Sequence, residues 1–415
     1  MSRDQGPTLD GVDRPTGGGM KTIHVLVIDD SAVVRQVLRE LISHEPDMTV
    51  SVAGDPIIAD KKIRTQRPDV VILDLELPVM DGLTWLRRQM TTDPIPVIVC
   101  SARVGDAAVP TIRALEEGAV DVVPKPRLGV RDFLLESRDP LIGAIRAAAG
   151  AHVQPRPRAP IADDASRSTL PSVTPRIEPA RRVTTPPRPT TEARIPARRA
   201  EIRPAARVIA IGASTGGPQA VQAVLSALPA DAPGVVVVQH MSGVFTPAFA
   251  RRLSDLCTIE VREAREGDRV VPGIAWIAPG GQHMELRVGP AGEQLIHLHS
   301  GAMVRGHRPS VDVLFRSLTR TSGASTLAVL LTGMGNDGAQ GLLELRHAGA
   351  ATLVESQESC VVFGMPKAAL DLGAAELSLP LPDIPACVLR WIADTHDGNA
   401  STAPSLRTPP GKERR

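Results

Sequence analysis

Residues 209–218 read IAIGASTGGP, an apolar run that leads directly into a glycine-rich turn. The apolar residues that follow, between Ala220 and Leu228, recur at the spacing of one helix face. Small residues on both sides of Ser214 permit a tight turn that exposes its hydroxyl, which matches the G-x-S-x-G pattern. The stretch therefore predicts a strand, a sharp turn that carries Ser214, and a helix.

Short apolar runs elsewhere in the chain also alternate with helical patterns, which is typical of parallel sheets covered by helices on both faces. We therefore predict two α/β domains, a doubly wound parallel sheet over residues 20–147 and a mainly parallel sheet over residues 204–393. The runs are Ile23–Ile28, Thr49–Ala53, Val70–Leu73, Pro96–Cys100 and Asp121–Val123 in the first, and Val208–Gly212, Gly234–Gln239, Ile274–Ala278, Thr326–Thr332 and Ala351–Val354 in the second.

Residues 148–203 separate these two regions and differ from them in composition. They are rich in proline and arginine and contain few large apolar residues. Such a segment cannot bury enough apolar surface to offset the entropy of ordering, so we predict a flexible, disordered linker. The tail at residues 394–415 has a similar composition, so we predict that it is disordered too. Residues 1–19 lack the apolar stretch of a signal peptide and Met20 directly precedes the first predicted strand, so we interpret them as a disordered extension or a misassigned start.

The overall composition excludes several classes of function. The formal net charge is +1 over 415 residues, so nothing draws the whole molecule to nucleic acid or to an anionic membrane. The arginines of the linker lack interleaved aromatic residues, which favours a solvated segment over a nucleic-acid site. The 4 cysteines form no CxxC pair, as expected of reduced thiols in a cytoplasmic protein. No apolar run reaches the ~18 residues of a membrane span, so we predict no membrane insertion.

The glycine-rich turn alone is compatible with two chemistries. A helix N-terminus offers free N–H groups and positive potential, which suit either an oxyanion or a bound phosphate. Attack by a serine also requires a base and an acid that orients the base. His240 ends the run at 234–239 and Asp337 lies in the loop after the run at 326–332, so all three side chains would reach the carboxyl edge of one sheet. This arrangement favours Ser214 as nucleophile, His240 as base and Asp337 as orienting acid.

Two other histidines compete for a role at this edge. His283 follows the turn at 279–281 and begins a hairpin pattern, so we expect it at the surface. His307 lies in a loop and could line a pocket. The order Ser, His, Asp along the chain also differs from the Ser, Asp, His order of α/β-hydrolases, which argues against simple membership of that family.

Polar groups also gather at the ends of the strands predicted for the first region. Asp29 and Asp30 close one run and Asp74 closes another. Carboxylates at one sheet edge suit Mg²⁺, which binds carboxylates, waters and phosphate oxygens. Ser101 ends the next strand and Lys125 follows the last, where a hydroxyl and an ammonium group could hold a phosphoryl group.

The first region resembles the receiver domains of two-component systems. The resemblance rests on VIDDS at 27–31, LDLELPVMDG at 73–82, CSA at 100–102 and KP at 125–126. It implies a flavodoxin-like fold in which Asp74 accepts a phosphoryl group from a histidine kinase. It also implies a cis peptide bond before Pro126. The resemblance further implies a Mg²⁺ site formed by Asp29, Asp30, Asp74 and the carbonyl of Glu76, and switch roles for Ser101 and Lys125.

The second region resembles the catalytic domain of the chemotaxis protein-glutamate methylesterases. The matching stretches are IGASTGGP at 211–218, QHM at 239–241, HRPSVDVLF at 307–315, LTGMGNDG at 331–338 and SCVVFGMP at 359–366. The resemblance implies the same catalytic roles for Ser214, His240 and Asp337. It adds an oxyanion contribution from the backbone N–H of Met334 and a supporting role for Thr215. The implied substrates are methylated glutamates, and glutamines, on chemoreceptors.

These observations predict an esterase that is controlled by a receiver domain and needs no cofactor for hydrolysis. Two hypotheses from other functional classes compete with this prediction. In the first, the glycine-rich turn is a nucleotide-binding loop of a receiver-controlled binding module, and His240 is dispensable. In the second, the chain is a DNA-binding response regulator, which requires a helix-turn-helix that the strand-rich second region does not provide.

Overall fold

The computed structural model describes residues 22–78, 80–102, 108–125, 131–153, 155 and 207–394, with only the backbone described for 131–137. The predicted extension at 1–19, nearly all of the linker, the tail beyond Asp394 and the peptide bond to Pro126 lie outside these residues. In the described part of the chain, no helix is both long and apolar enough to cross a membrane.

The N-terminal domain contains a five-stranded sheet in the order β2-β1-β3-β4-β5, in which all strands are parallel. This is the flavodoxin-like order, as predicted. The strands are β1 (Ile23–Ile28), β2 (Met48–Ala53), β3 (Val70–Leu73), β4 (Val97–Ser101) and β5 (Asp121–Pro124). The helices are α1 (Ala32–Ser43), α2 (Pro56–Thr65), α3 (Gly82–Thr92), α4 (Val109–Glu116) and α5 (Arg131–Ala149).

Local sequence explains how these helices begin and which side they cover. The side chains of Ser31, Asp55 and Asp81 accept hydrogen bonds from backbone N–H groups in the first turns of α1, α2 and α3. One face of the sheet packs against α1 and α5, and the other against α2, α3 and α4. Strands β3 and β4 in the middle of the sheet are buried throughout, which explains their nearly continuous apolar sequences.

The C-terminal domain is built around a seven-stranded parallel sheet in the order β14-β13-β12-β6-β7-β9-β8. The prediction of a mainly parallel sheet is confirmed, and the short edge strands β8 and β14 extend it. The strands are β6 (Val208–Ala213), β7 (Gly234–Gln239), β8 (Glu260–Glu263), β9 (Ile274–Ile277), β12 (Thr326–Leu330), β13 (Ala351–Glu355) and β14 (Leu377–Leu379). Strands β10 (His283–Val288) and β11 (Gln294–His299) form a separate antiparallel hairpin.

Helices cover both faces of this sheet. Apolar residues of α6 (Gly217–Leu225), α7 (Thr246–Leu256) and α11 (Ile384–Ala393) pack against one face. The hairpin packs against the other face together with α8 (Val311–Thr321), α9 (Ala339–His347) and α10 (Met365–Asp371). The strand order diverges between β6 and β12, and the carboxyl end of such a switch point is where parallel sheets bind ligands.

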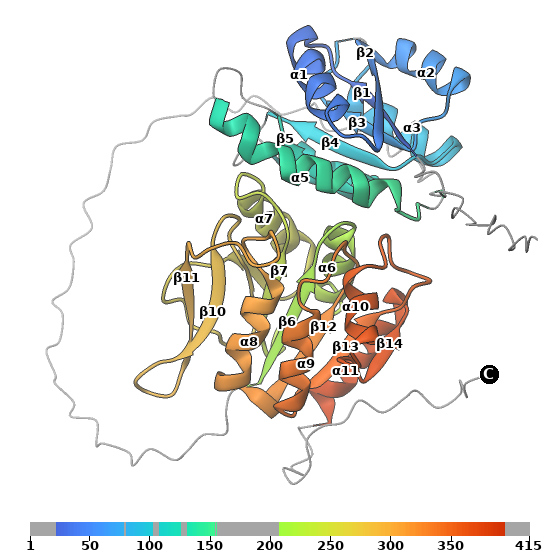
Figure 1. The fold of residues 1–415 in the computed structure, drawn as a ribbon. Coiled ribbons are helices and arrows are strands. Elements are labelled where there is room, and N and C mark those ends of the chain that lie inside the picture. The colour runs from blue at the N-terminus through green and yellow to red at the C-terminus, as the bar shows by residue number, and fades with distance from the viewer. Residues whose placement is uncertain are drawn as a thin grey trace, which may run out of the picture.

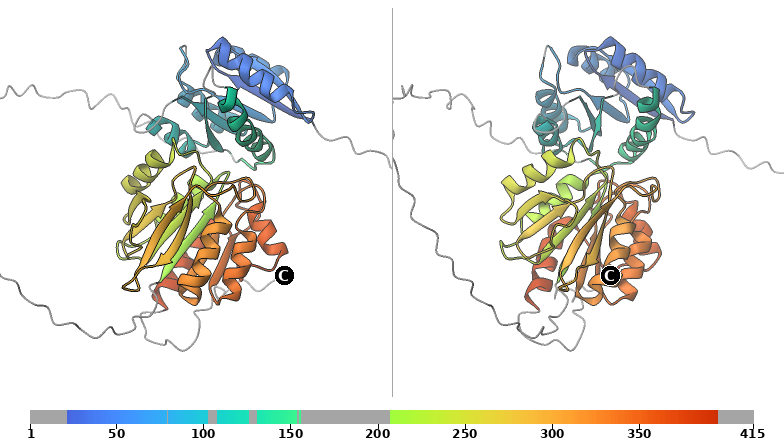
Figure 2. Two further views of the ribbon diagram at one scale, coloured as in Figure 1. Left: turned by 60° about the vertical axis from the view of Figure 1, so that its left-hand side comes forward. Right: turned by 90° about the vertical axis from the view of Figure 1, so that its left-hand side faces the viewer.

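The two domains are in contact, as Figures 1 and 2 show. Helix α4 packs against α6 and α7. Because α6 starts directly after the turn that carries Ser214, the N-terminal domain lies at the carboxyl end of the seven-stranded sheet. The contact therefore adjoins the predicted active site.

Candidate active site and phosphorylation site

The turn that carries Ser214 is held on both sides by neighbouring strands. The Ser214 N–H donates to the carbonyl of Thr332 at 3.0 Å, and the Ser214 carbonyl accepts from the Gln239 side chain at 2.8 Å. Gly216, which precedes α6, has φ +75°, a conformation that favours glycine. The predicted strand, turn and helix are confirmed, and Ser214 is 8% exposed.

Strand register brings the two predicted partners to the same edge. Gly212 of β6 pairs with Val238 of β7 and with Leu330 of β12. His240 therefore lies directly beside the turn that carries Ser214, and the backbone N–H of His240 donates to the Ala213 carbonyl at 3.0 Å. The His240 ring bonds through Nε2 to Oδ2 of Asp337 at 2.9 Å.

Asp337 is almost fully buried and accepts several further hydrogen bonds. Its oxygens accept from the Ser310 hydroxyl at 2.7 Å and from the N–H groups of Val311 and Asp312 at 2.7 and 3.1 Å. Burial opposes ionisation of the Asp337 carboxyl. The hydrogen bond and charge of His240, with the bonds from Ser310 and Val311, outweigh burial and lower its pKa to about 2. Asp337 is therefore an anion at the N-terminus of α8, which favours negative charge.

The orientation of the His240 ring decides which of its nitrogens faces Asp337 and which does not. Because Nε2 bonds Asp337, the remaining nitrogen is Nδ1, which is buried and has no hydrogen-bond partner among the described residues. Within the same residues, no hydrogen bond joins Ser214 Oγ to His240. In free enzymes such bonds are commonly long and tighten when substrate binds.

A second imidazole lies flat against His240. The ring centroids of His240 and His307 are 3.8 Å apart and their planes differ by 8°. Burial, followed by the nearby His240, lowers the pKa of His307 to about 4, so His307 is neutral at pH 7. The expectation that His307 could line a pocket is consistent with this position. His283, by contrast, was expected at the surface and is 1% exposed, so that prediction is wrong.

The loop after β12 approaches Ser214 closely. A Cβ atom built on Gly333 would lie 2.7 Å from Cβ of Ser214, so only glycine allows this approach. Met334 follows it, and its backbone N–H makes no hydrogen bond within the described part of the chain. The side chain of Thr215, on the other side, lies close enough to Asp121 of the N-terminal domain to lower the pKa of that carboxyl.

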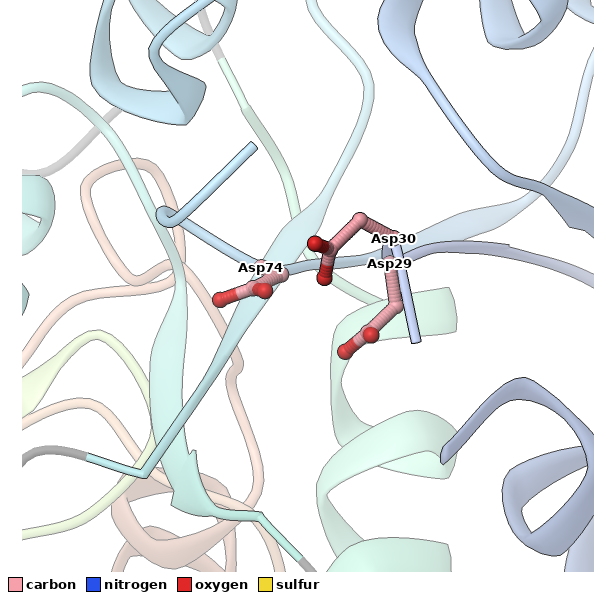
Figure 3. A group of neighbouring side chains, drawn as sticks. All are labelled: Asp29, Asp30 and Asp74. Carbon is pink, nitrogen blue, oxygen red and sulfur yellow. The ribbon is translucent and has the colours of Figure 1, made fainter. Parts of the chain in front are cut away.

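The N-terminal domain has its own polar cluster at the switch point between β1 and β3. Carboxylate oxygens of Asp29, Asp30 and Asp74, one from each residue, lie within 4.8 Å of one another. Figure 3 shows the three side chains. Lys125 Nζ contacts Asp74 at 2.6 Å and Asp29 at 2.8 Å. Burial raises the pKa of Asp74, against the hydrogen bond from Lys125 and the N–H of Glu76. These hard oxygen donors fit Mg²⁺.

Ser101 is placed at the end of β4, 5% exposed, and accepts a hydrogen bond from the hydroxyl of Thr111 at 2.9 Å. Thr111 belongs to α4, the helix that contacts the C-terminal domain. The predicted switch residue is therefore linked by one hydrogen bond to the helix at the domain contact.

Comparison with known proteins finds a separate family match in each of the two sheet regions. Residues 25–131 match the response regulator receiver domain family, and residues 209–388 match the CheB methylesterase family. The chain is 47% identical over 376 residues to protein-glutamate methylesterase/protein-glutamine glutaminase 5 of Anaeromyxobacter dehalogenans, covering 90% of this chain and 98% of that protein. The chain belongs to the CheB methylesterase family.

A second CheB relative is protein-glutamate methylesterase/protein-glutamine glutaminase 2 of Pseudomonas syringae pv. tomato. It is 44% identical over 373 residues, which cover 89% of this chain and 99% of that protein. Among solved structures, the CheB methylesterase catalytic domain of Thermotoga maritima is 36% identical, with a TM-score of 0.44, and the match covers 45% of this chain and 98% of that domain.

The contact between the CheB receiver and methylesterase domains includes atoms close to Ser214. The N–H of Gly216 donates to the carbonyl of Val120 in the receiver at 3.1 Å. The side chain of Gln219 donates to the carbonyls of Leu115 and Ala119 at 2.6 and 2.9 Å. In addition, Arg252 makes a bidentate ion pair with Glu116, in which Nε and Nη2 of Arg252 donate to Oε1 and Oε2 of Glu116 at 2.6 and 2.9 Å.

Sequence reasoning did not identify three residues of this CheB site. Ser310 and Glu355 hydrogen-bond to Asp337 and Thr332 respectively, and Asp121 reaches Thr215 from the receiver. Ser310 lies within HRPSVDVLF at 307–315 and caps the N-terminus of α8. Its place before a helical pattern is the feature of the sequence that could have identified it. Nothing local to Asp121 or Glu355 marks them, since their partners are distant in sequence.

Proposed function

We propose that this chain is a phosphorylation-activated serine hydrolase that demethylates glutamate methyl esters, and deamidates glutamines, on chemoreceptors. The observation that carries the proposal is the 2.9 Å hydrogen bond between His240 and Asp337 beside the turn that holds Ser214. A nucleotide-binding loop has no need of this pair. Membership of the CheB methylesterase family supports the substrate class.

In the proposed mechanism, Ser214 Oγ attacks the side-chain carbonyl carbon while its proton passes to Nδ1 of His240. The tetrahedral intermediate then collapses, the ester C–O bond breaks, and His240 returns the proton so that methanol leaves. Water attacks the acyl-enzyme with His240 again taking the proton, and glutamate and free Ser214 are regenerated. With glutamine as substrate, the leaving group is ammonia.

The surroundings of Ser214 support transition-state stabilisation. The N–H of Met334, which has no hydrogen-bond partner among the residues that the structure describes, lies in the loop that packs against Ser214 through Gly333. This supports the assignment of Met334 as an oxyanion donor. Asp337 fixes the tautomer of His240 and stabilises its imidazolium form. The hydroxyl of Thr215 adjoins the nucleophile and is free to assist once the contact with Asp121 is broken.

The receiver supplies the proposed regulation. A histidine kinase would phosphorylate Asp74, and Asp29, Asp30, Asp74 and the carbonyl of Glu76 would hold the Mg²⁺ ion that neutralises phosphoryl charge there. Ser101 and Lys125 would then contact the phosphoryl group. In the unphosphorylated protein, the receiver contacts around Gly216 and Arg252 obstruct the approach of a receptor helix to Ser214. The free state of all four cysteines supports a cytoplasmic location.

The decisive experiment measures methanol release from methylated chemoreceptor membranes. Wild type and Ser214→Ala are compared, each with and without a small-molecule phosphodonor and Mg²⁺. We expect release from wild type that rises with the phosphodonor and disappears in Ser214→Ala. His240→Ala should abolish release as well.

No release from wild type under either condition would refute the substrate class. Release that persists in His240→Ala would refute the triad, and nucleotide binding by that variant would return the glycine-rich turn to the phosphate-binding reading. Equal release with and without the phosphodonor would refute the regulatory part alone.

A further inference from the structure

A buried carboxylate that the proposed mechanism does not use lies under the nucleophile turn. Glu355 ends β13 and is 0% exposed. Its Oε2 accepts from the N–H of Thr332 at 2.9 Å, and its Oε1 accepts from the hydroxyl of Ser359 at 2.9 Å. In the described part of the chain, no cation forms an ion pair with it. Burying a carboxyl group without a counter-charge is costly, so its hydrogen bonds must provide the compensation.

Thr332 connects this carboxylate to the backbone on both sides of the nucleophile. The carbonyl of Thr332 accepts the N–H of Ser214 at 3.0 Å. The hydroxyl of Thr332 donates to the carbonyl of Thr215 at 3.0 Å. The peptide group before Ser214 and the peptide group after Thr215 are therefore both bonded to Thr332, and Thr332 is bonded to Glu355.

The second oxygen of Glu355 fixes the loop at residues 356–364. The hydroxyl of Ser359, which donates to Glu355, also accepts the N–H of Leu381 at 2.9 Å. Farther along this loop, the N–H of Val362 donates to the Thr332 hydroxyl at 2.9 Å, and the N–H of Gly333 donates to the Val362 carbonyl at 3.0 Å. Glu355 thus joins the loop beside Gly333 to the turn that carries Ser214.

We infer that Glu355 is a positioning residue for the hydrolase reaction, which fixes the backbone around Ser214 through Thr332 and so sets the direction of the serine hydroxyl. The inference rests on the proposed function of Ser214. Burial raises the pKa of the Glu355 carboxyl, while the bonds from Thr332 and Ser359 favour its ionised form. What the site requires of Glu355 is an acceptor for the N–H of Thr332, and a neutral amide also supplies one.

The test is a matched series in the full-length chain with phosphodonor and Mg²⁺, using methylated receptor membranes as substrate. Glu355→Gln retains an acceptor for Thr332 and offers a donor to Ser359, whereas Glu355→Leu has similar size and no acceptor. A displacement of about 1 Å at a reacting atom costs ~100-fold in rate, so we expect Glu355→Leu to lower kcat by roughly 10- to 100-fold with KM within about twofold. We expect Glu355→Gln to stay within about threefold of wild type.

A second readout reports on Ser214 without any receptor. A fluorophosphonate reagent modifies activated serines, and its second-order rate constant should fall in Glu355→Leu in parallel with kcat. If Glu355→Leu does not fold, Thr332→Val and Thr332→Ser replace it, because only the serine variant keeps the hydroxyl. We then expect the valine variant to lose about tenfold in kcat and the serine variant to retain most of it.

Ser214→Ala separates this inference from the function on which it rests. If wild type is inactive or Ser214→Ala is active, the proposed function fails. If wild type is active, Ser214→Ala is inactive, and folded Glu355→Leu or Thr332→Val matches wild type in kcat and labelling rate, the positioning role is refuted. A rise in KM with unchanged kcat would also refute it, because that result indicates lost binding and not a misplaced nucleophile.

Discussion

The imidazole of His307 stacks on that of His240 with ring centroids 3.8 Å apart. At neutral pH His307 is uncharged, since its pKa is lowered to about 4 by burial and then by His240. In the proposed mechanism His240 becomes an imidazolium in the transition state, and a neutral ring can stabilise that form, as aromatic faces stabilise cations. We expect His307→Ala to lower kcat by about fivefold and His307→Phe, which keeps a flat ring, to retain most of the activity.

The measurement is kcat for demethylation by both variants at pH 7.5 in the presence of phosphodonor. Circular dichroism of both variants controls for folding. Equal losses in His307→Ala and His307→Phe would show that the ring nitrogens of His307, and not its stacking face, are what matter.

Replacement of Asp337 tests the orientation of His240. Asp337→Asn preserves size and part of the hydrogen bonding from Ser310 and Val311, so the fold should survive. The amide can donate to Nε2 of His240 and would stabilise the wrong tautomer. By analogy with other triads, we expect kcat to fall by on the order of 10⁴. The check is single-turnover demethylation at neutral pH, and a loss of only a few-fold would contradict the role of Asp337.

The bidentate ion pair between Arg252 and Glu116 should help to hold the receiver against the methylesterase domain, which we call the closed state. Both side chains are partly exposed, so the pair contributes about 1 kcal/mol, or about fivefold in the closing equilibrium. We therefore expect Arg252→Glu to raise activity without phosphodonor by about fivefold and to leave phosphorylated activity nearly unchanged. The exchanged pair Glu116→Arg with Arg252→Glu should restore low basal activity. An unaltered basal rate in Arg252→Glu would show that this contact does not limit access to Ser214.

The positions of the residues at strand ends were predictable because the carboxyl ends of parallel strands lie at one edge of a sheet. That rule alone predicted Ser214, His240 and Asp337 at the carboxyl edge of the C-terminal sheet, and Asp29 and Asp74 at the carboxyl edge of the N-terminal sheet. The environment of these residues was not predictable in the same way. Hydrogen bonds to Asp337 come from Ser310, at the start of a helix that follows a separate hairpin, and local sequence does not fix where that helix packs.

His283 illustrates the same limit. Its hairpin pattern suggested a solvent-exposed strand, but the hairpin packs on α8. The ring is therefore enclosed, with Nε2 bonded to the carbonyl of Ala302 at 3.0 Å and Nδ1 accepting the N–H of Ser310 at 3.2 Å. The hydrogen bond between Val120 and Gly216 could not be predicted from the sequence either, because it depends on how two separately folded domains pack together.

The contact between Asp121 and Thr215 predicts a pH-dependent domain contact. Burial raises the pKa of the Asp121 carboxyl from 3.8 to about 7, against hydrogen bonds from Val122 and Thr215. When the domains separate and the carboxyl becomes solvated, the pKa returns toward its ordinary value, so the closed state binds more protons. Closure is therefore strongest at low pH, weakens as pH rises toward about 7, and is constant above that.

The measurement is the ratio of activity with phosphodonor to activity without it, at several pH values from 5.5 to 8. We expect this ratio to fall by at least about threefold in wild type as pH rises to 7, because closure weakens by up to tenfold per pH unit. Asp121→Asn cannot ionise and keeps a hydrogen-bonding partner for Thr215. The ratio of its activities with and without phosphodonor should therefore stay constant over this pH range, apart from pH effects that wild type and the variant share. A ratio in Asp121→Asn that follows wild type across this range would show that another group controls the contact.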